Sequence, residues 1–201
     1  HAWNFGVQLV ALNYQNNDES MALCYGKFLD NGGCGYVLKP KYLRQSNENQ
    51  FYPLNPIHDY DTPMYLTIHM ISGQFLPLSS ENSKDIPDVY VQMSIHGLAC
   101  DENTEKTKFI NNNAFDPIWN ETFRFHIRFP QLALIYFAVM DYDKLSQDDR
   151  LAYFCCPVTL LQSGYRHIHL RANNNDPIHS TLFAHIDIQY EDTETTCRTR
   201  L

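Results

Sequence analysis

The 201-residue sequence contains no apolar run of about 18 residues, so nothing in it predicts a helix that crosses a bilayer. Basic residues are also few, with 15 Lys and Arg against 23 Asp and Glu and a formal charge of −8. Unspecific nucleic-acid binding needs clustered basic residues, so we expect no nucleic-acid partner. The same shortage argues against unaided adhesion to an anionic membrane.

The cysteines lack the spacing of a zinc site, because no C-x-x-C pair occurs. Two of the six are adjacent in a segment that reads as a strand, so their side chains should point to opposite faces. We interpret the set as reduced, mostly buried thiols of an intracellular protein. The six are Cys24, Cys34, Cys100, Cys155, Cys156 and Cys197. The sequence begins with His1 instead of Met, which we interpret as the start of a fragment.

The first 44 residues predict a strand, a helix and a second strand, over 7–14, 20–30 and 35–38. The first segment, VQLVALNY, is mostly apolar, as in a strand buried on both faces. The helix has Ser20 or Asp18 as its cap, and the Asn-Gly-Gly that follows would end it. One such unit cannot bury its own sheet, so we do not expect it to fold alone.

The character of the chain changes twice after this region. Residues 45–63 contain three prolines and no periodicity, which is typical of a linker. From residue 64 onward, about eight short strands, one of them KTKFI (106–110), alternate with turn-rich loops, a pattern that favours an antiparallel sandwich. In the first of them Leu66, Ile68 and Met70 share one face. In FDPIWNETFRF (115–125) the aromatic residues alternate as core positions.

Two stretches, WNFGVQLVALNYQ (3–15) and NGGCGYVLKPKYLR (31–44), resemble the end of the Y region, the second catalytic half of eukaryotic phosphoinositide-specific phospholipase C. Residues 64–190 resemble the C2 domain that follows it, from IHMISGQFLP through FAVMDYD to GYRHIHL. The resemblance implies a mixed fold. It consists of the C-terminal strands and helix of a TIM-like (β/α)8 barrel over 1–44, a linker over 45–63, an all-β antiparallel C2 sandwich over 64–190 and a tail over 191–201.

The glycines around Cys34 have a structural interpretation within that barrel. Glycine lets the chain turn sharply into the closing strand, and Lys39-Pro40 would end the strand, since proline cannot extend a central ladder. Cys34 has no histidine partner in a recognisable motif, so a nucleophile role is unsupported.

The family cleaves phosphatidylinositol 4,5-bisphosphate into diacylglycerol and inositol trisphosphate, with two histidines and a catalytic calcium. The resemblance implies that these groups lie in the X half and that the substrate-binding Ser and Arg lie upstream of Trp3. We therefore assign no catalytic residue to this chain and expect it to be inactive alone. Its expected partners are an anionic phospholipid membrane, the phosphoinositide substrate and the missing catalytic X half.

The implied location is cytoplasmic and peripheral on the inner face of the plasma membrane. An alternative is a catalytically inactive phospholipase-like scaffold that uses its C2 domain to bind protein or lipid. A third interpretation, an extracellular adhesion sandwich, conflicts with the NGGCGYVLKP block.

The C2 resemblance implies a calcium cup at one end of the sandwich. Its candidate ligands are Asp88, Asp141, Asp143 and Asp149, with Asp148 as competitor for the last position. Calcium takes six to eight oxygen ligands, and residues two apart at a strand end point the same way. Gathered carboxylates repel each other until a cation neutralises them. The first-loop ligand stays open among three residues, Glu81, Asn82 and Asp85. The alternative is a set of solvated loop aspartates.

Membrane contact is the other expected role. Trp3 matches a tryptophan near the barrel rim that dips into the membrane, and an indole suits that interface. Alternatively, Trp3 packs under the barrel. Four basic residues could form a lipid-facing patch or simply be solvated, namely Lys106, Lys108, Arg124 and Arg128.

Overall fold

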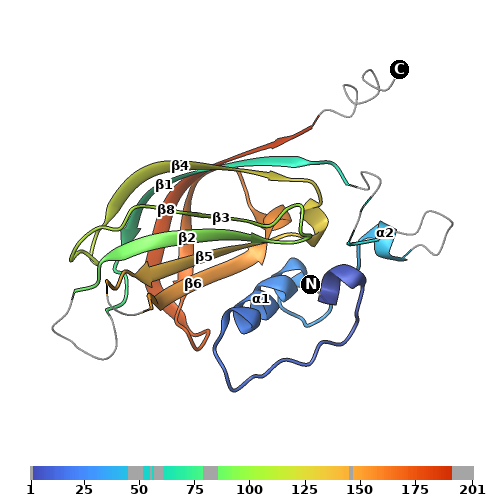
Figure 1. The fold of residues 1–201 in the computed structure, drawn as a ribbon, viewed down its shortest axis with the longest axis horizontal. Coiled ribbons are helices and arrows are strands. Elements are labelled where there is room, and N and C mark those ends of the chain that lie inside the picture. Colours follow the sequence, from blue (N-terminus) through green and yellow to red (C-terminus); the bar gives the residue numbers. More distant parts are fainter. Residues whose placement is uncertain are drawn as a thin grey trace.

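The computed structural model describes most of the chain as one arrangement of a short N-terminal segment and a β-sandwich (Figure 1). The described residues are 2–44, 52–54, 56, 61–78, 86–144 and 147–191. Most of the expected linker and nearly all of the expected tail lie outside them. None of the helices in the described part of the chain is long and apolar enough to cross a membrane.

The N-terminal segment contains four short helical elements: η1 (Ala2–Phe5), α1 (Glu19–Lys27), η2 (Phe28–Asn31) and α2 (Lys41–Arg44). The side chain of Asp18 accepts a hydrogen bond from the backbone N–H of Met21 at 3.0 Å, so Asp18 caps α1 instead of Ser20. Gly32 ends η2 with a left-handed φ of 61°. The predicted helix is therefore present and continues as a 3-10 turn.

The strands predicted over 7–14 and 35–38 are wrong, because none of the described residues 2–44 belongs to a sheet. A strand is held by hydrogen bonds to a neighbour, and an apolar run does not supply one. Without that cover their large side chains face outward, with Leu9 90% and Tyr36 81% exposed. The barrel end that the resemblance implied is represented here by its helix and not by its strands.

The sandwich consists of eight antiparallel strands in the order β3-β2-β5-β6-β7-β8-β1-β4. Between β6 and β7 the register holds a single pair, Tyr153 and Arg171, so the order divides into two four-stranded sheets. The strands are β1 (Met64–Gln74), β2 (Val89–His96), β3 (Asn103–Lys106), β4 (Ile118–Ile127), β5 (Leu134–Asp141), β6 (Asp149–Pro157), β7 (Gly164–Arg171) and β8 (Pro177–Tyr190), with 3-10 turns η3 (Pro130–Leu132) and η4 (Val158–Leu160). The predicted antiparallel sandwich is confirmed.

One strand is displaced from its prediction. We expected it over 106–110, but β3 ends at Lys106, and Ile110 forms an isolated bridge with Val89. The regular ladder ends at Gln92 opposite Lys106, because beyond it the N–H of Val91 donates to the side-chain Oγ1 of Thr107 in place of a backbone oxygen.

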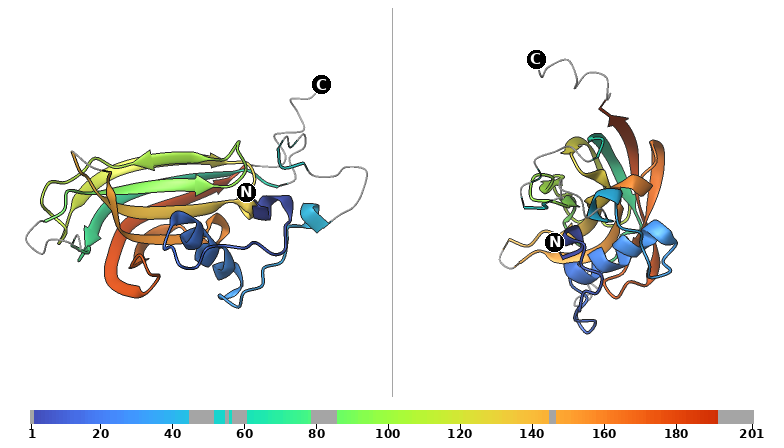
Figure 2. Two further views of the ribbon diagram at one scale, coloured as in Figure 1. Left: turned by 60° about the horizontal axis from the view of Figure 1, so that its bottom comes forward. Right: turned by 90° about the vertical axis from the view of Figure 1, so that its right-hand side faces the viewer.

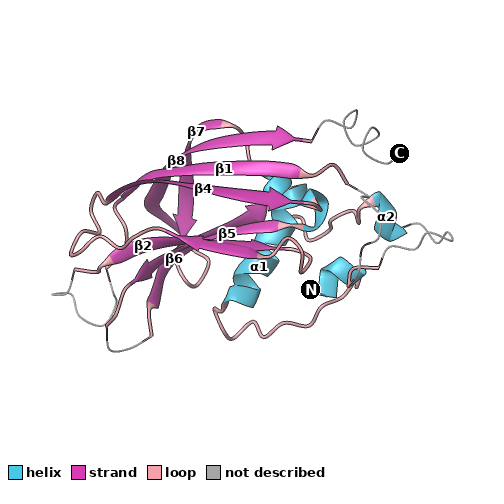
Figure 3. Cartoon of the chain, turned by 45° about the horizontal axis from the view of Figure 1, so that its top comes forward, coloured by secondary structure: helices cyan, strands magenta, loops and turns pink. Residues whose placement is uncertain are grey.

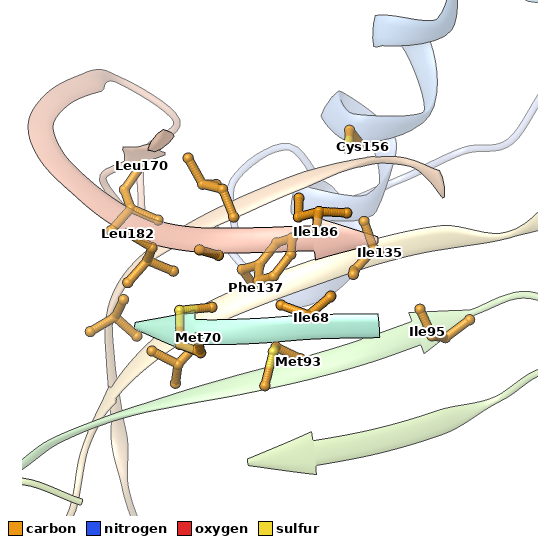
Figure 4. Packing of buried hydrophobic residues seen from close by; sticks show 14 of the residues in the cluster. Ile68, Met70, Met93, Ile95, Ile135, Phe137, Cys156, Leu170, Leu182 and Ile186 are labelled. Atoms are coloured by element: carbon orange, nitrogen blue, oxygen red, sulfur yellow. The ribbon is translucent and has the colours of Figure 1, made fainter. Parts of the chain in front are cut away.

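The main core lies between the two sheets (Figure 4). Leu66, Ile68 and Met70 are fully buried, so the predicted alternation along the first strand is confirmed. Trp119 and Phe125 are also buried and belong to the same cluster. Figure 4 shows side chains from both sheets meeting there, with Ile68 and Met70 facing Phe137 and Met93.

The N-terminal segment packs on the outer face of the sheet formed by β3, β2, β5 and β6, as Figures 2 and 3 show for α1 beside β5 and β6. The contact has its own apolar cluster, made of Ala22, Leu134, Tyr136, Ala138, Tyr153 and Cys155. A second cluster joins Tyr42 to Leu98, Phe129 and Leu132. The Nδ2 group of Asn4 also donates to the carbonyl oxygen of Gly97 at 2.7 Å, in a buried position. The segment is thus stabilised by the sandwich rather than by a sheet of its own.

Candidate functional site

Strand register brings aspartates from three neighbouring strands to one end of the sandwich. Val89 pairs with Asp141, and Asp141 pairs with Asp149. Asp88 directly precedes β2, while Asp143 follows β5 after one residue and Asp148 directly precedes β6. We call the group of Asp88, Asp141, Asp143, Asp148 and Asp149 the aspartate rim. Four of these five were the predicted cup, and the fifth was its competitor.

Backbone hydrogen bonds fix the inner part of the rim. The N–H of Asp88 donates to Oδ1 of Asp141 at 2.8 Å, and the N–H of Tyr142 donates to the carbonyl oxygen of Asp88 at 3.0 Å. From the loop between β3 and β4, the N–H of Asn112 donates to Oδ1 of Asp88 at 2.9 Å. Asp88 thereby joins three loops, and the Asp141 side chain, only 9% exposed, is held at their centre.

Asp148 and Asp149 have different surroundings. Both carboxylate oxygens of Asp148 accept hydrogen bonds, from the hydroxyl of Tyr90 at 2.7 Å and from the N–H of Asp143 at 3.0 Å. Burial of Tyr90, and then its bond to Asp148, raise the pKa of that hydroxyl. Asp149 is exposed and lies directly opposite Asp141. The structure therefore favours a bracing role for Asp148 and leaves Asp149 as the better candidate ligand.

The chemistry of this donor set fits a hard divalent cation. All candidate donors are carboxylate oxygens, which calcium prefers, and a pair of carboxylates directly opposite in a sheet is destabilising without a cation. In the described part of the chain, no group of three or more His, Cys, Asp or Glu side chains is already gathered as a metal centre. The first-loop candidates Glu81, Asn82 and Asp85 lie outside the described residues.

Exposed aromatic side chains lie on the loops at the same end of the sandwich as the aspartate rim, and the sequence patterns did not predict them. Phe75 and Phe115, from two different loops, are 60% and 66% exposed and meet edge-to-face with ring centroids 5.0 Å apart. Phe109 stacks on Tyr142 at 4.4 Å. Phe75 adopts a left-handed φ of 52°, which is uncommon for a bulky residue and holds this ring outward. The sequence signal was an apolar residue inside the polar turn NNNAFDP, at Phe115.

The structure does not bring Trp3 to the aspartate rim. The indole is half-buried and packs edge-on against Phe28, with ring centroids 6.4 Å apart. Its neighbour Asn4 is bonded to Gly97, which follows β2, whereas Asp88 precedes β2. Eight residues of strand separate these ends by about 26 Å.

The four basic residues considered for a lipid-facing patch are also divided. Lys106 lies in β3 and its ammonium sits 5.6 Å from the ring centre of Tyr90, while Arg124 lies in β4 of the other sheet. The guanidinium of Arg128 lies over Phe129. A single patch formed by one sheet face therefore does not include all four.

The comparison with protein families identifies the family of the β-sandwich. The model of the C2 domain matches residues 64–172, more than half of the chain. The chain belongs to the C2 domain family. A second model, that of the phosphatidylinositol-specific phospholipase C Y domain, matches residues 1–42, so the N-terminal segment that packs on the C2 domain corresponds to the end of that domain.

Similar proteins share this arrangement. A Danio rerio protein named 1-phosphatidylinositol 4,5-bisphosphate phosphodiesterase delta-3-A is 42% identical over 192 residues, covering 92% of this chain and 24% of the relative. The delta-1 protein of Homo sapiens is also 42% identical over 192 residues, covering 93% and 25%. The crystal structure of S. officinalis PLC21 superposes with a TM-score of 0.81 at 32% identity, covering 95% of this chain and 24% of that one.

These matches confirm the resemblance to the end of a Y region followed by a C2 domain. The chain spans about a quarter of the length of the curated relatives that it matches. The boundaries of the linker and the tail stay predictions.

Proposed function

We propose that this chain is the C-terminal part of a phosphoinositide phospholipase C that hydrolyses phosphatidylinositol 4,5-bisphosphate to diacylglycerol and inositol trisphosphate. The names of its relatives and the paired Y-domain and C2 matches support this. No catalytic residue is assigned within the chain, which is inactive without the X half. The complete enzyme is cytoplasmic and peripheral on the inner face of the plasma membrane.

Within that enzyme, the C2 domain docks the catalytic barrel on an anionic membrane when calcium is present. The residues that would hold calcium are Asp88, Asp141, Asp143 and Asp149. Bound calcium supplies positive charge that offsets the carboxylates and accepts lipid phosphate. The position of the calcium site would be set by the aspartate rim, because backbone N–H groups hold the carboxylates of Asp88 and Asp141 in place.

One observation carries this proposal: the carboxylates and exposed phenylalanines share the same end of the sandwich. A charged rim alone would be repelled by an anionic surface, and an apolar cluster alone would lack selectivity for it. Moving roughly 100 Å² of each exposed ring from water into lipid is worth about 2.5 kcal/mol. Phe75 and Phe115 would thus add apolar insertion to the electrostatic contact.

Membrane contact by Trp3 remains a separate proposal. Its packing on Phe28 supports the structural alternative, and its distance from the aspartate rim means that the two need not touch the bilayer together. A variant at Trp3 therefore belongs in the same experiment.

The test is sedimentation of the chain with phosphatidylserine-containing liposomes, in calcium and in chelator. We expect calcium to drive binding, and Asp141→Asn/Asp143→Asn to reduce it to the chelator level. Phe75→Asn/Phe115→Asn should weaken binding by at least about tenfold while calcium dependence remains, because asparagine tolerates the backbone of Phe75.

The charge control is Asp187→Asn, which removes a single carboxylate charge from β8, where Asp187 pairs with Thr67 away from the rim. It should bind as the unchanged chain does. Binding that is absent or indifferent to calcium would remove calcium from the proposal and favour a C2 domain that serves as a protein-binding scaffold. Loss of binding only in Trp3→Ala would instead move membrane contact to the N-terminal segment.

A further inference from the structure

Arg150 is the second residue of β6, directly after the candidate calcium ligand Asp149. We propose that Arg150 is a positioning residue that couples the aspartate rim to the N-terminal Y-domain segment, so that calcium bound at the rim tightens that segment on the C2 domain. This inference rests on the proposed function and assigns a route by which the rim orients the catalytic part.

A β-bulge near the start of β6 sets which face of the sheet Arg150 occupies, while ordinary alternation points Asp149 the other way. Val139 pairs with Ala152 and Met140 pairs with Arg150, which leaves Leu151 as the extra residue. Leu151 and Ala152 accordingly both lie in the main core, although they are consecutive. Bulges reorient side chains in this way. The bulge places Arg150 on the outer face of the sheet, where the N-terminal segment packs, and Asp149 beside Asp141 on the rim side.

Arg150 connects four parts of the fold through its guanidinium. Nη2 donates to the carbonyl oxygen of Asn17 in the N-terminal segment, and Nη1 donates to the hydroxyl of Tyr136 in β5 at 2.8 Å. Nε donates to Oδ1 of Asn173 in the turn between β7 and β8 at 2.7 Å, and Asn173 donates back to the carbonyl oxygen of Arg150. The guanidinium also lies 4.9 Å from the ring centre of Tyr153. A planar fork can satisfy these acceptors together, whereas an ammonium cannot.

The contact with Asn17 is placed where it can fix the whole segment. Asn17 precedes Asp18, whose side chain caps α1, so holding Asn17 sets where the helix begins. A pocket of about 660 Å³ is lined both by residues of this part of the segment, Asp18 and Glu19, and by residues at the start of β6, Asp149 and Arg150. Arg150 therefore joins the segment to the sheet beside an open pocket, through its hydrogen bond to Asn17.

The coupling follows from these positions. Asp141 and Asp149 oppose each other at the first register pair of β6, so without a cation their repulsion acts on the start of that strand. A calcium ion shared by both would hold this start against β5. Because Arg150 is the next residue on the same strand, its contact with Asn17 is then more often formed. Linkage requires the reverse as well, so that loss of the Arg150 contact weakens calcium binding.

The experiment compares the unchanged chain with Arg150→Lys, which keeps the charge near the rim and loses the fork. Hydrogen–deuterium exchange is followed over residues 13–22, where the amides of Asn16 and Met21 are hydrogen-bonded, and calcium affinity is measured by calorimetry. In the unchanged chain we expect calcium to slow this exchange by about fivefold or more. In Arg150→Lys we expect no slowing and about fivefold weaker calcium binding.

Arg166→Lys is the matched control, since Arg166 of β7 donates to the carbonyl oxygens of Gln162 and Ser163, just before its own strand. It should respond to calcium as the unchanged chain does. The coupling is overturned if calcium binds the unchanged chain and leaves the exchange unaltered, if Arg150→Lys retains the response, or if Arg166→Lys loses it too. If calorimetry shows no calcium binding to the unchanged chain, the proposed rim fails and the coupling fails with it.

Discussion

Gly26 offers the sharpest test of how the N-terminal segment sits on the C2 domain. It lies in α1 facing Cys155 of β6, and a Cβ added there would overlap the Sγ atom and lie 2.8 Å from the Cβ atom and 2.9 Å from the carbonyl carbon of Cys155. Real Cβ atoms essentially never approach so closely, and one of the three contacts is with backbone. We predict that Gly26→Ala forces α1 away from the sheet.

Two opposing effects set the magnitude. Alanine is favoured over glycine inside a helix by about 1 kcal/mol. Overpacking a close contact costs about 1–3 kcal/mol, and the upper part of that range applies because the backbone at Cys155 cannot rotate away. The clash therefore wins, and we expect a net loss of about 1–2 kcal/mol in the free energy of unfolding. For a chain of this size that loss lowers Tm by roughly 2–8 °C.

The assay is thermal and urea unfolding followed by circular dichroism, with Gly97→Ala as control. A Cβ at Gly97 meets Ala133 at an ordinary 3.4 Å, so that variant should be neutral or slightly more stable. Cys155→Ala in the Gly26→Ala background should recover part of the loss, because it removes the nearest atom. A Gly26→Ala variant as stable as the unchanged chain would refute the reasoning. It would show that α1 does not approach Cys155 closely enough for the added methyl group to clash.

Two further predictions concern charge and pH. In chelator, Asp141→Asn should raise the free energy of unfolding by about 0.2–1 kcal/mol, because it removes the like-charge pair with Asp149 while Oδ1 can still accept a hydrogen bond from the N–H of Asp88. In calcium, the variant should instead be less stable than the unchanged chain. Urea unfolding midpoints in both buffers test this reversal, and a variant that is less stable in chelator contradicts it. Burial raises the pKa of the Cys156 thiol from its ordinary 9.0 to about 12, so the stability that it contributes is complete below pH 9 and is lost as the pH rises toward 12. Urea unfolding from roughly pH 8 to pH 11 gives the free energy of unfolding as a function of pH. Its fall with pH should be shallower in Cys156→Ala by up to about 1.4 kcal/mol per pH unit. Equal slopes in the two proteins would show that this thiol is not buried in the folded state.

The sequence by itself determined the features that depend on local pattern. Alternation along the first strand identified Leu66, Ile68 and Met70 as core, and turn-rich loops set off the other strands. These predictions held because a strand buried on one face repeats every two residues wherever its partners lie. The candidate aspartates came from the resemblance to a C2 domain, and the spacing in MDYD adds that two of the carboxylates share one strand end. The family resemblance came from equally local blocks.

Only the tertiary structure decided what depends on neighbours distant in the chain. Residues 7–14 have the composition of a buried strand, but hydrogen-bonded neighbours make a strand, and none of the described residues supplies one to them. The bulge that directs Arg150 toward Asn17 arises from the register between β5 and β6, which no single segment contains. The exposed Phe75 and Phe115 meet because the N–H of Phe75 donates to the carbonyl oxygen of Phe115, and Trp3 lies at the other end of β2 because Asn4 is bonded to Gly97. In each case the deciding contact joins residues far apart in sequence, and local periodicity carries no information about such a pairing.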